Sequence, residues 1–402
     1  MEDVQKPRHI YHVGYKFPEV YQDGLLGLVK RFPTNNSDAF RRDYGRILVY
    51  VESPLSYFQR DVIHILLQLY DRPLRCFVFL DFLLAPTLEE YSDLLDIPML
   101  HQVPFHAGMK EPEVAHIAAT LFSQGSVMKS NIRHKGGVNG YHLGFLVQKA
   151  NVKADKKDWK AFNAILTCCI YGIILFPNER KFVDMNAISI FIQKNPVPTL
   201  LGYMYHFMHS RNDKGKGGVV FCCASLLHRW FSSHLPSQGA FVDTQHTMRW
   251  SNHLMGLTSK DLNWYKPGLG RLENKDIIVK CGGFPNVPLL GIRGGVNYNH
   301  TFSRRKLGYA LRVPMTDREV MESLSYNVPD STGMMEKATK AWENVHLEGS
   351  TYFGQRDSGI YSPYVQWLVE RNKSPRWTFP LEDPLYDQSP NQPDVVPRGS
   401  YD

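Results

Sequence analysis

Apolar positions recur at helical spacing in most parts of the chain that contain them. Between Leu55 and Leu69 they return every three or four residues, which places them on one face of a helix. Ser53 and Pro54 precede this run, and a hydroxyl residue followed by proline is typical of a helix start. The same reasoning predicts a long helix from Asp155 to Ile173, a helix that starts at Thr258–Asp261 and one that starts at Ser362. It also predicts shorter helices over residues 87–97, 111–122, 184–193, 199–210, 219–235, 244–256, 316–324 and 335–342.

Short runs of β-branched and aromatic residues interrupt the helical pattern. Arg46–Glu52 and Leu74–Phe82 have the composition of strands. Residues 276–300 combine such runs with glycines and are predicted as a strand or loop insert, whereas the glycine-rich residues 129–144 are predicted as a loop. The expected fold class is mainly α: an irregular multi-helix domain with a few short β-strands or hairpins.

Prolines and polar residues set the expected domain limits. Residues 1–45 contain Pro7, Pro18 and Pro33 and are predicted to be an irregular N-terminal segment. Residues 46–380 are predicted to form a single helical domain. Residues 381–402 are polar and proline-rich, which predicts a disordered tail.

Composition excludes some classes of protein and permits others. Of the 402 residues, 43% are hydrophobic, which is enough for a large core and excludes wholesale disorder. The net charge of +7 is modest, so nucleic acid is a permitted partner but not a required one. Two adjacent cysteine pairs in apolar stretches, with no Cys-x-x-Cys, predict buried thiols in a reducing compartment.

The chain is expected to be intracellular. Acidic residues stand near the N-terminus where a signal peptide would be basic. The uncharged, mostly apolar run Ala161–Phe176 is shorter than the ~20 apolar residues of a membrane span, so no membrane partner is expected.

The motifs that resemble sites of chemistry each have a simpler structural interpretation. Lys214–Gly218 is glycine-rich but follows a predicted helix and lacks the P-loop spacing, so a connector is favoured. Asp357-Ser358-Gly359 has the letters of an aspartic protease triplet, but Gln355 and Arg356 precede it and a turn is favoured. Arg293-Gly294-Gly295 is a lone Arg-Gly-Gly and is predicted to be a turn.

Metal sites were considered on two sets of residues. His206 and His209 share one helical face, but zinc requires further ligands from elsewhere. Asp81 resembles the first acidic position of a two-metal nuclease, and Asp184 or Glu319 are among many carboxylates that would complete a set without a specific spacing. No catalytic, cofactor-binding or metal-binding residue is therefore assigned, and neither a cofactor nor a small-molecule substrate is expected.

Several blocks, in a common order along the chain, resemble the plant mobile domain family and in particular a divergent, uncharacterised plant branch. Phe77–Met99 resembles the family's strand, capping box and helix, although Asp96-Ile97-Pro98 lacks the glycine of its turn. Asn286–Tyr309 is similar to the branch's Val-Pro-Leu, Asn-Tyr-Asn and Leu-Gly-Tyr signature, but Arg304-Arg305-Lys306 replaces the usual Arg-Gln pair. The remaining blocks are Phe176–Met208, Gly217–Leu235, Met248–Tyr265 and Tyr361–Arg371.

The resemblance implies a helical domain found in transposable elements and in host proteins derived from them. It implies nuclear roles in silencing and meristem maintenance and transfers no catalytic residue. The family's aminotransferase-like label has no support here, because no lysine stands out as a Schiff-base site.

The leading hypothesis is a non-catalytic, transposon-derived nuclear interaction module that contacts protein or nucleic acid. The alternatives are a metal-dependent nuclease or transposase-like enzyme fragment, and a domesticated element protein with no biochemical activity. If nucleic acid is bound, the predicted contacts are the basic loops that contain Lys129, Arg133, Lys135, Lys214, Lys216, Arg304, Arg305 and Lys306.

Overall fold

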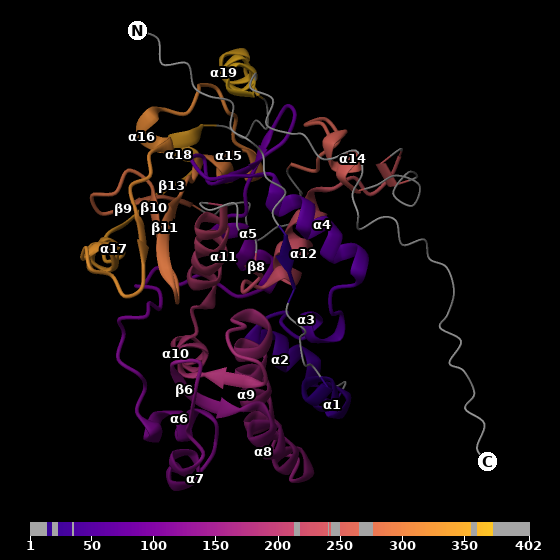
Figure 1. Ribbon diagram of the computed structural model, residues 1–402, viewed down its shortest axis with the longest axis vertical. Coiled ribbons are helices and arrows are strands. Elements are labelled where there is room, and N and C mark those ends of the chain that lie inside the picture. Colours follow the sequence, from indigo (N-terminus) through magenta and orange to yellow (C-terminus); the bar gives the residue numbers. More distant parts are fainter. Residues whose placement is uncertain are drawn as a thin grey trace, which may run out of the picture.

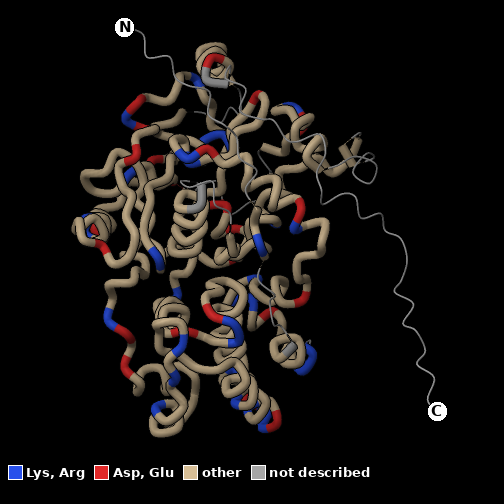
Figure 2. Tube along the Cα trace, viewed as in Figure 1, with Lys and Arg blue, Asp and Glu red and all other residues tan. Residues whose placement is uncertain are grey.

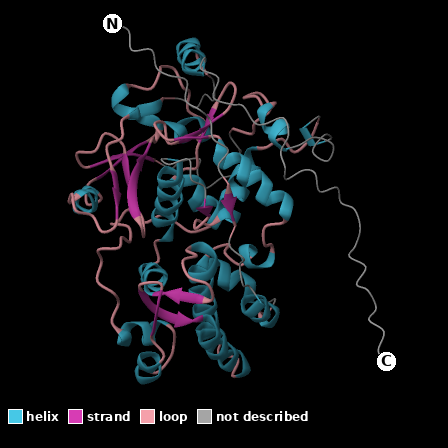
Figure 3. Ribbon diagram, viewed as in Figure 1, coloured by secondary structure: helices cyan, strands magenta, loops and turns pink. Residues whose placement is uncertain are grey.

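The computed structural model describes residues 14–17, 23–33, 36–212, 218–239, 241–242, 250–264, 276–354 and 360–372. Helices dominate, and the strands are short and belong to small separate sheets (Figure 3). The expectation of a mainly α fold with a few short strands is confirmed. The predicted disordered tail, 381–402, lies outside the described residues.

One half of the molecule, the lower one in Figure 1, is a helical layer with a small antiparallel sheet. Its helices are α1 (Asp23–Arg31), α2 (Ser37–Tyr44), α3 (Val49–Glu52), α6 (Val114–Thr120), α7 (Gly125–Ser130), α8 (Leu143–Asp155), α9 (Trp159–Ile170), the π-helical turn η2 (Tyr171–Leu175) and α10 (Met185–Gln193). Its strands are β5 (Arg133–Lys135), β6 (Val138–His142) and β7 (Phe182–Asp184), with β6 in the centre.

The upper half of Figure 1 holds the remaining long helices and three of the sheets. Its helices are α4 (Tyr57–Gln68), α5 (Leu88–Leu95), α11 (Pro196–Asn212), α12 (Ala224–His234), α14 (Trp250–Met255), α15 (Thr301–Lys306), α16 (Asp317–Val320), α17 (Met334–Ala341), α18 (Ser350–Phe353) and α19 (Ser362–Asn372). One antiparallel sheet has the strand order β2 (Tyr70–Asp71), β3 (Cys76–Val78), β4 (Leu83–Leu84). A second has the order β10 (Val287–Leu290), β11 (Gly294–Tyr298), β12 (Ser325–Asn327). The third is the antiparallel pair of β9 (Ile277–Cys281) and β13 (Val345–Glu348). A parallel pair joins β1 (Tyr15–Lys16) to β8 (Gly218–Val219).

Helix α11 packs closely against β10 and β11 because small residues stand at the contact. A Cβ on Gly202 would lie 2.5 Å from the carbonyl oxygen of Leu290, so only glycine fits at this crossing. Gly294 and Gly295, which were predicted as a turn, are instead the first residues of the buried strand β11. The Arg-Gly-Gly sequence therefore serves helix-to-sheet packing.

A continuous buried cluster runs through both halves and includes residues from Tyr15 to Leu368. All six cysteines are free and buried within the fold, which confirms their predicted place. Among the residues described, no helix is long and apolar enough to cross a membrane.

Several predicted elements differ from the observed ones. Arg46–Glu52 was predicted as a strand, but its second half forms helix α3, whose Tyr50 and Val51 are buried. The supposedly irregular N-terminal segment contains α1 and α2. The predicted loop 129–144 instead contains the end of α7, the β-hairpin formed by β5 and β6, and the start of α8. Thr258–Asp261 forms a turn closed by the Asp261 carboxylate rather than the first turn of a helix.

Candidate functional site

The predicted contacts Lys129, Arg133 and Lys135 belong to one compact part of the fold. Lys129 lies in the last turn of α7, and Arg133 and Lys135 lie on β5, which the two-residue turn Gly136–Gly137 joins to β6. Both glycines have positive φ, 59° and 81°, which a two-residue hairpin turn of type I′ requires. The chain then continues directly through α8 and α9, which pack against each other.

Residues 125–181, named here the basic segment, contain the whole net charge of the protein. They hold ten Lys or Arg residues against three Asp or Glu, a net charge of +7. The 46 basic and 39 acidic residues of the chain, less these ten and three, leave 36 of each, so the rest of the chain is neutral. The ten are Lys129, Arg133, Lys135, Lys149, Lys153, Lys156, Lys157, Lys160, Arg180 and Lys181.

Each of the three carboxylates in the basic segment already has a cationic partner. Asp155 lies 2.5 Å from the guanidinium of Arg31 on α1, and Asp158 lies 3.1 Å from the ammonium of Lys153. Glu179 lies 3.7 Å from Lys135. Two of these pairs lie within the segment and the third joins it to α1, so none of them lowers the segment's net charge of +7.

That excess is concentrated at the turn between α8 and α9 and at α7. Lys129, Lys156, Lys157 and Lys160 are all exposed. Figure 2 shows the blue Lys and Arg positions of the segment along α7, the hairpin and the lower end of α8. The Lys160 ammonium lies 5.7 Å from the centre of the Phe122 ring at the end of α6, which connects the α8–α9 turn with the α6–α7 region.

Sequence reasoning did not assign the lysines of the α8–α9 turn to a contact surface. The signal was the run of Lys153, Lys156, Lys157 and Lys160. This run straddles the end of one helix and the start of the next, so its members gather at the tip of a helical hairpin.

The other predicted contacts lie elsewhere. Lys214 and Lys216 are outside the described residues. Lys306 and Arg305 are buried, with 4% and 8% of their surfaces exposed, and Arg304 pairs with Glu319 at 3.6 Å. The guanidinium of Arg305 stacks on the Trp264 ring at 3.3 Å. We therefore no longer place Arg305 and Lys306 on a contact surface, because both serve the interior of the fold.

Lys306 belongs to a buried polar cluster around Glu90. One oxygen of Glu90 accepts hydrogen bonds from the Lys306 ammonium at 2.7 Å and from the Trp230 indole N–H at 2.9 Å. The other oxygen lies 2.7 Å from Nε2 of His234. Lys306 also donates to the carbonyl of Ala85. The cluster, defined by Glu90, Trp230, His234 and Lys306, joins α5, α12 and α15.

The local sequence and the long-range partners both fix Glu90. Thr87 and Glu90 form the predicted capping box at the start of α5, so the carboxylate is held at the helix N-terminus. Burial by itself would raise the pKa of Glu90, but Lys306 and His234 lower it to about 2. The Nδ1 atom of His234 lies 3.0 Å from the carbonyl oxygen of Asn263, so both ring nitrogens have an oxygen within hydrogen-bond distance. The cluster thus pairs the buried carboxylate of Glu90 with partners from α12 and α15 and functions as a structural clamp.

The histidines and carboxylates considered for metal binding have separate partners. His206 lies 3.0 Å from the amide oxygen of Asn327, whereas His209 faces Arg72 and Glu322. Asp81 accepts hydrogen bonds from the backbone and hydroxyl of Ser259 at 2.9 and 2.8 Å. Within the described ranges, no group of three or more His, Cys, Asp or Glu residues has a geometry that could hold a metal ion.

Residues 25–373 match the protein family described as "domain of unknown function (DUF7745)". The chain belongs to this family. No curated protein and no solved structure matches the chain. The basic segment and the Glu90 cluster both lie within the matched DUF7745 domain, whereas the resemblance to the plant mobile domain stays a hypothesis.

Proposed function

We propose that this DUF7745 protein is a non-catalytic nuclear interaction module that binds nucleic acid through the phosphates, using its basic segment. The observation that carries the proposal is the concentration of the net charge of +7 in residues 125–181 of an otherwise neutral chain. The three carboxylates of the segment form their ion pairs with Arg31, Lys153 and Lys135 rather than with Lys129, Lys156, Lys157 or Lys160.

Lysine ammonium groups on an exposed surface recognise the charge of phosphates rather than a base sequence. Neutralising phosphates releases condensed counterions, and the affinity then falls steeply with salt. The four exposed lysines at α7 and the α8–α9 turn correspond to roughly four phosphate contacts and a log–log salt slope of about −3.6. We expect little discrimination between sequences, because side chains that reach base edges are what specify sequence.

A fluorescence anisotropy titration with a short labelled DNA duplex, repeated from about 50 to 200 mM salt, tests the proposal. The variant Lys129→Gln, Lys156→Gln, Lys157→Gln, Lys160→Gln is expected to reduce the salt slope by about three to four and to weaken binding at low salt at least ~10-fold.

The matched control makes the identical charge change outside the basic segment. Lys260, Lys280, Lys337 and Lys340 are exposed, and their replacement by glutamine is expected to leave the slope nearly unchanged. Equal losses in the two variants would show that only total charge matters, and an absence of wild-type binding to DNA or RNA at low salt would refute nucleic-acid binding altogether.

The nuclear location and the transposon origin in this proposal rest on the resemblance to the plant mobile domain family, with the silencing and meristem roles that it implies. A fluorescent fusion of the whole chain tests the location separately. Exclusion of the fusion from the nucleus would remove the nuclear part of the proposal without affecting the binding experiment.

A further inference from the structure

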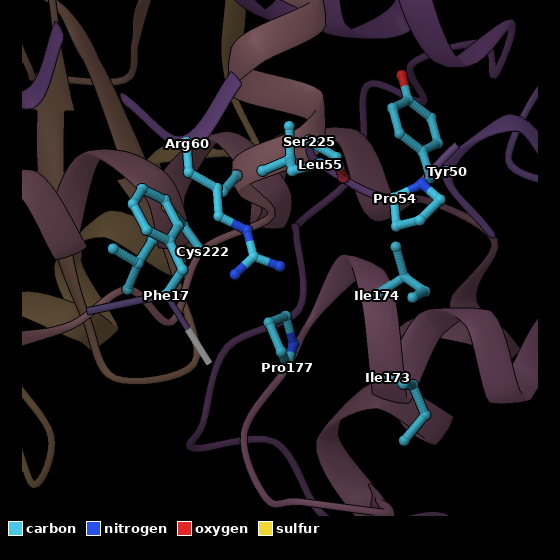
Figure 4. A pocket seen from close by; sticks show the side chains of 12 residues that line it. Phe17, Tyr50, Pro54, Leu55, Arg60, Ile173, Ile174, Pro177, Cys222 and Ser225 are labelled. Atoms are coloured by element: carbon cyan, nitrogen blue, oxygen red, sulfur yellow. The ribbon is translucent and has the colours of Figure 1, made fainter. Parts of the chain in front are cut away.

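A pocket of about 90 Å³ lies where the two halves of the molecule meet, and its wall is largely apolar. Phe17, beside β1, and Leu55, just before α4, contribute from the N-terminal part of the chain. Ile173 and Ile174 of η2 and Val220, just after β8, contribute from distant parts of the sequence (Figure 4). Elements from both halves must therefore pack correctly for the pocket to exist.

The pocket contains one cationic side chain, Arg60. This residue follows the first turn of α4, and its guanidinium extends into the space between Phe17 and Ile174, towards Pro177 (Figure 4). None of the described residues that line the pocket is acidic. The side chain of Arg60 is partly buried among apolar residues, and a bidentate anion is the natural complement of its guanidinium.

The first turn of α12 lies on the same wall. Ala224 and Ser225, its first two residues, line the pocket, and the side chain of the N-cap residue Cys223 does not cap the helix. The positive end of the α12 dipole therefore adds to the charge of Arg60. These two features together favour an anion at one end of the pocket.

The opposite wall is shaped by the π-helical turn η2. Its two adjacent isoleucines, Ile173 and Ile174, both line the pocket. π-Turns are uncommon and occur frequently at functional sites. Ile173 and Ile174 present a branched aliphatic surface to the pocket, and an alkyl chain is the ligand group that matches such a surface.

We propose that this pocket binds a short aliphatic carboxylate, with the carboxylate on Arg60 and the alkyl chain against Ile173 and Ile174. The volume is smaller than the ~150 Å³ of the apolar cavity that accepts benzene, so a short chain fits and a fused ring system does not. Although Ile173 and Ile174 belong to the basic segment, none of its ten cations lines the pocket, and the site extends the function to a small ligand.

Propanoate and its neutral counterpart propan-1-ol are the probes, added to the full chain with ¹³C-methyl-labelled isoleucine. Propanoate is expected to shift the methyl resonances of Ile173 and Ile174 in a saturable way and to leave those of Ile63 and Ile117, which lie outside the pocket, in place. Propan-1-ol should bind about 10-fold more weakly, because it lacks the charge that pairs with Arg60.

Two substitutions separate charge from shape. Arg60→Met is expected to weaken propanoate binding about 10-fold or more while leaving propan-1-ol binding nearly unchanged, and Arg42→Met, on α2, serves as the matched control. Ala224→Leu fills the pocket and should weaken both ligands. The proposal is overturned if ~10 mM propanoate leaves Ile173 and Ile174 unshifted, or if propanoate and propan-1-ol bind wild type equally. The comparison of the two ligands uses only the wild-type protein, so it remains decisive even if Arg60→Met fails to fold.

Discussion

Arg305 and Lys306, beside and within the Glu90 cluster, and Lys156 and Lys157 of the basic segment are both pairs of adjacent basic residues, yet the two pairs have opposite environments. Arg305 and Lys306 are buried, and Lys306 pairs with a buried carboxylate. Lys156 and Lys157 stand exposed at the α8–α9 turn. The same pattern of adjacent cations therefore marks an internal clamp in one region and a solvent-facing surface in the other.

The difference lies in what each cation meets from the rest of the fold. Lys306 meets Glu90, whose carboxylate is buried at the N-terminus of α5 and needs a counter-charge. Around Lys156 the nearby carboxylates, Asp155 and Asp158, are engaged with Arg31 and Lys153. A buried partner from a distant part of the chain, Glu90 for Lys306 and the Trp264 ring for Arg305, thus accompanies the inward orientation of these cations.

Among the substitutions that test this comparison, removal of Glu90 should change the free energy of unfolding most. Glu90→Ala leaves Lys306 and His234 buried without their counter-charge, and loss of one partner of a buried pair destabilises by about 3–5 kcal/mol. Urea unfolding measures this change. The exposed Glu343→Ala should alter the free energy of unfolding by less than ~0.5 kcal/mol. A Glu90→Ala protein as stable as wild type would show that the cluster is not a clamp.

Replacing both Glu90 and Lys306 by apolar residues should destabilise the protein less than replacing Glu90 alone. In Glu90→Leu with Lys306→Met, the apolar side chains leave no unpaired charge between these two positions, so the double variant should recover about 2 kcal/mol relative to Glu90→Leu alone. His234 and Trp230 still lose an acceptor, so recovery should be partial. Additive losses in the double-mutant cycle would mean that Glu90 and Lys306 are not coupled.

The same clamp should weaken in acid. The pKa of Glu90 is about 2 in the folded protein against an ordinary value of 4.5, so its stabilisation is present above about pH 4.5 and is lost as pH falls towards 2. The stability difference between wild type and Glu90→Gln should therefore shrink over this interval. Unfolding midpoints measured between pH 6 and pH 3 provide the test, and a constant difference would contradict the assigned pKa.

The sequence predicted what local pattern determines. The Thr87–Glu90 capping box was visible as such, and helices α5, α10 and α11 follow from apolar spacing. The clamp was not predictable, because Lys306 and His234 are separated from Glu90 by 216 and 144 residues. No spacing rule joins positions so far apart.

Two errors had different causes. The β5–β6 hairpin was missed although Gly136–Gly137 between short runs is a two-residue turn signal, which the glycine content of the region obscured. Helix α3 was missed because Val49, Tyr50 and Val51 have β propensity that burial against the core overrides. The exposed lysines of the basic segment could be read from the sequence, but their grouping at the tip of the α8–α9 hairpin depends on the fold and could not.

The smallest expected effect concerns the tip itself, where Lys157 adopts a left-handed backbone with φ of 56°. This conformation costs a non-glycine residue about 1–2 kcal/mol, which a substitution by glycine would relieve. Part of that relief is offset by the greater conformational freedom of glycine in the unfolded chain. Lys157→Gly should therefore stabilise the protein by about 0.5 kcal/mol while weakening DNA binding slightly. The neighbouring Lys156 has φ of −86°, so Lys156→Gly relieves no strain and should lower stability. If both glycine variants lose stability equally, the backbone of the turn is not strained at Lys157. If only Lys157→Gly is more stable than wild type, the protein has a lysine at a position where glycine would be more stable. A binding role for the cation at the tip would explain this.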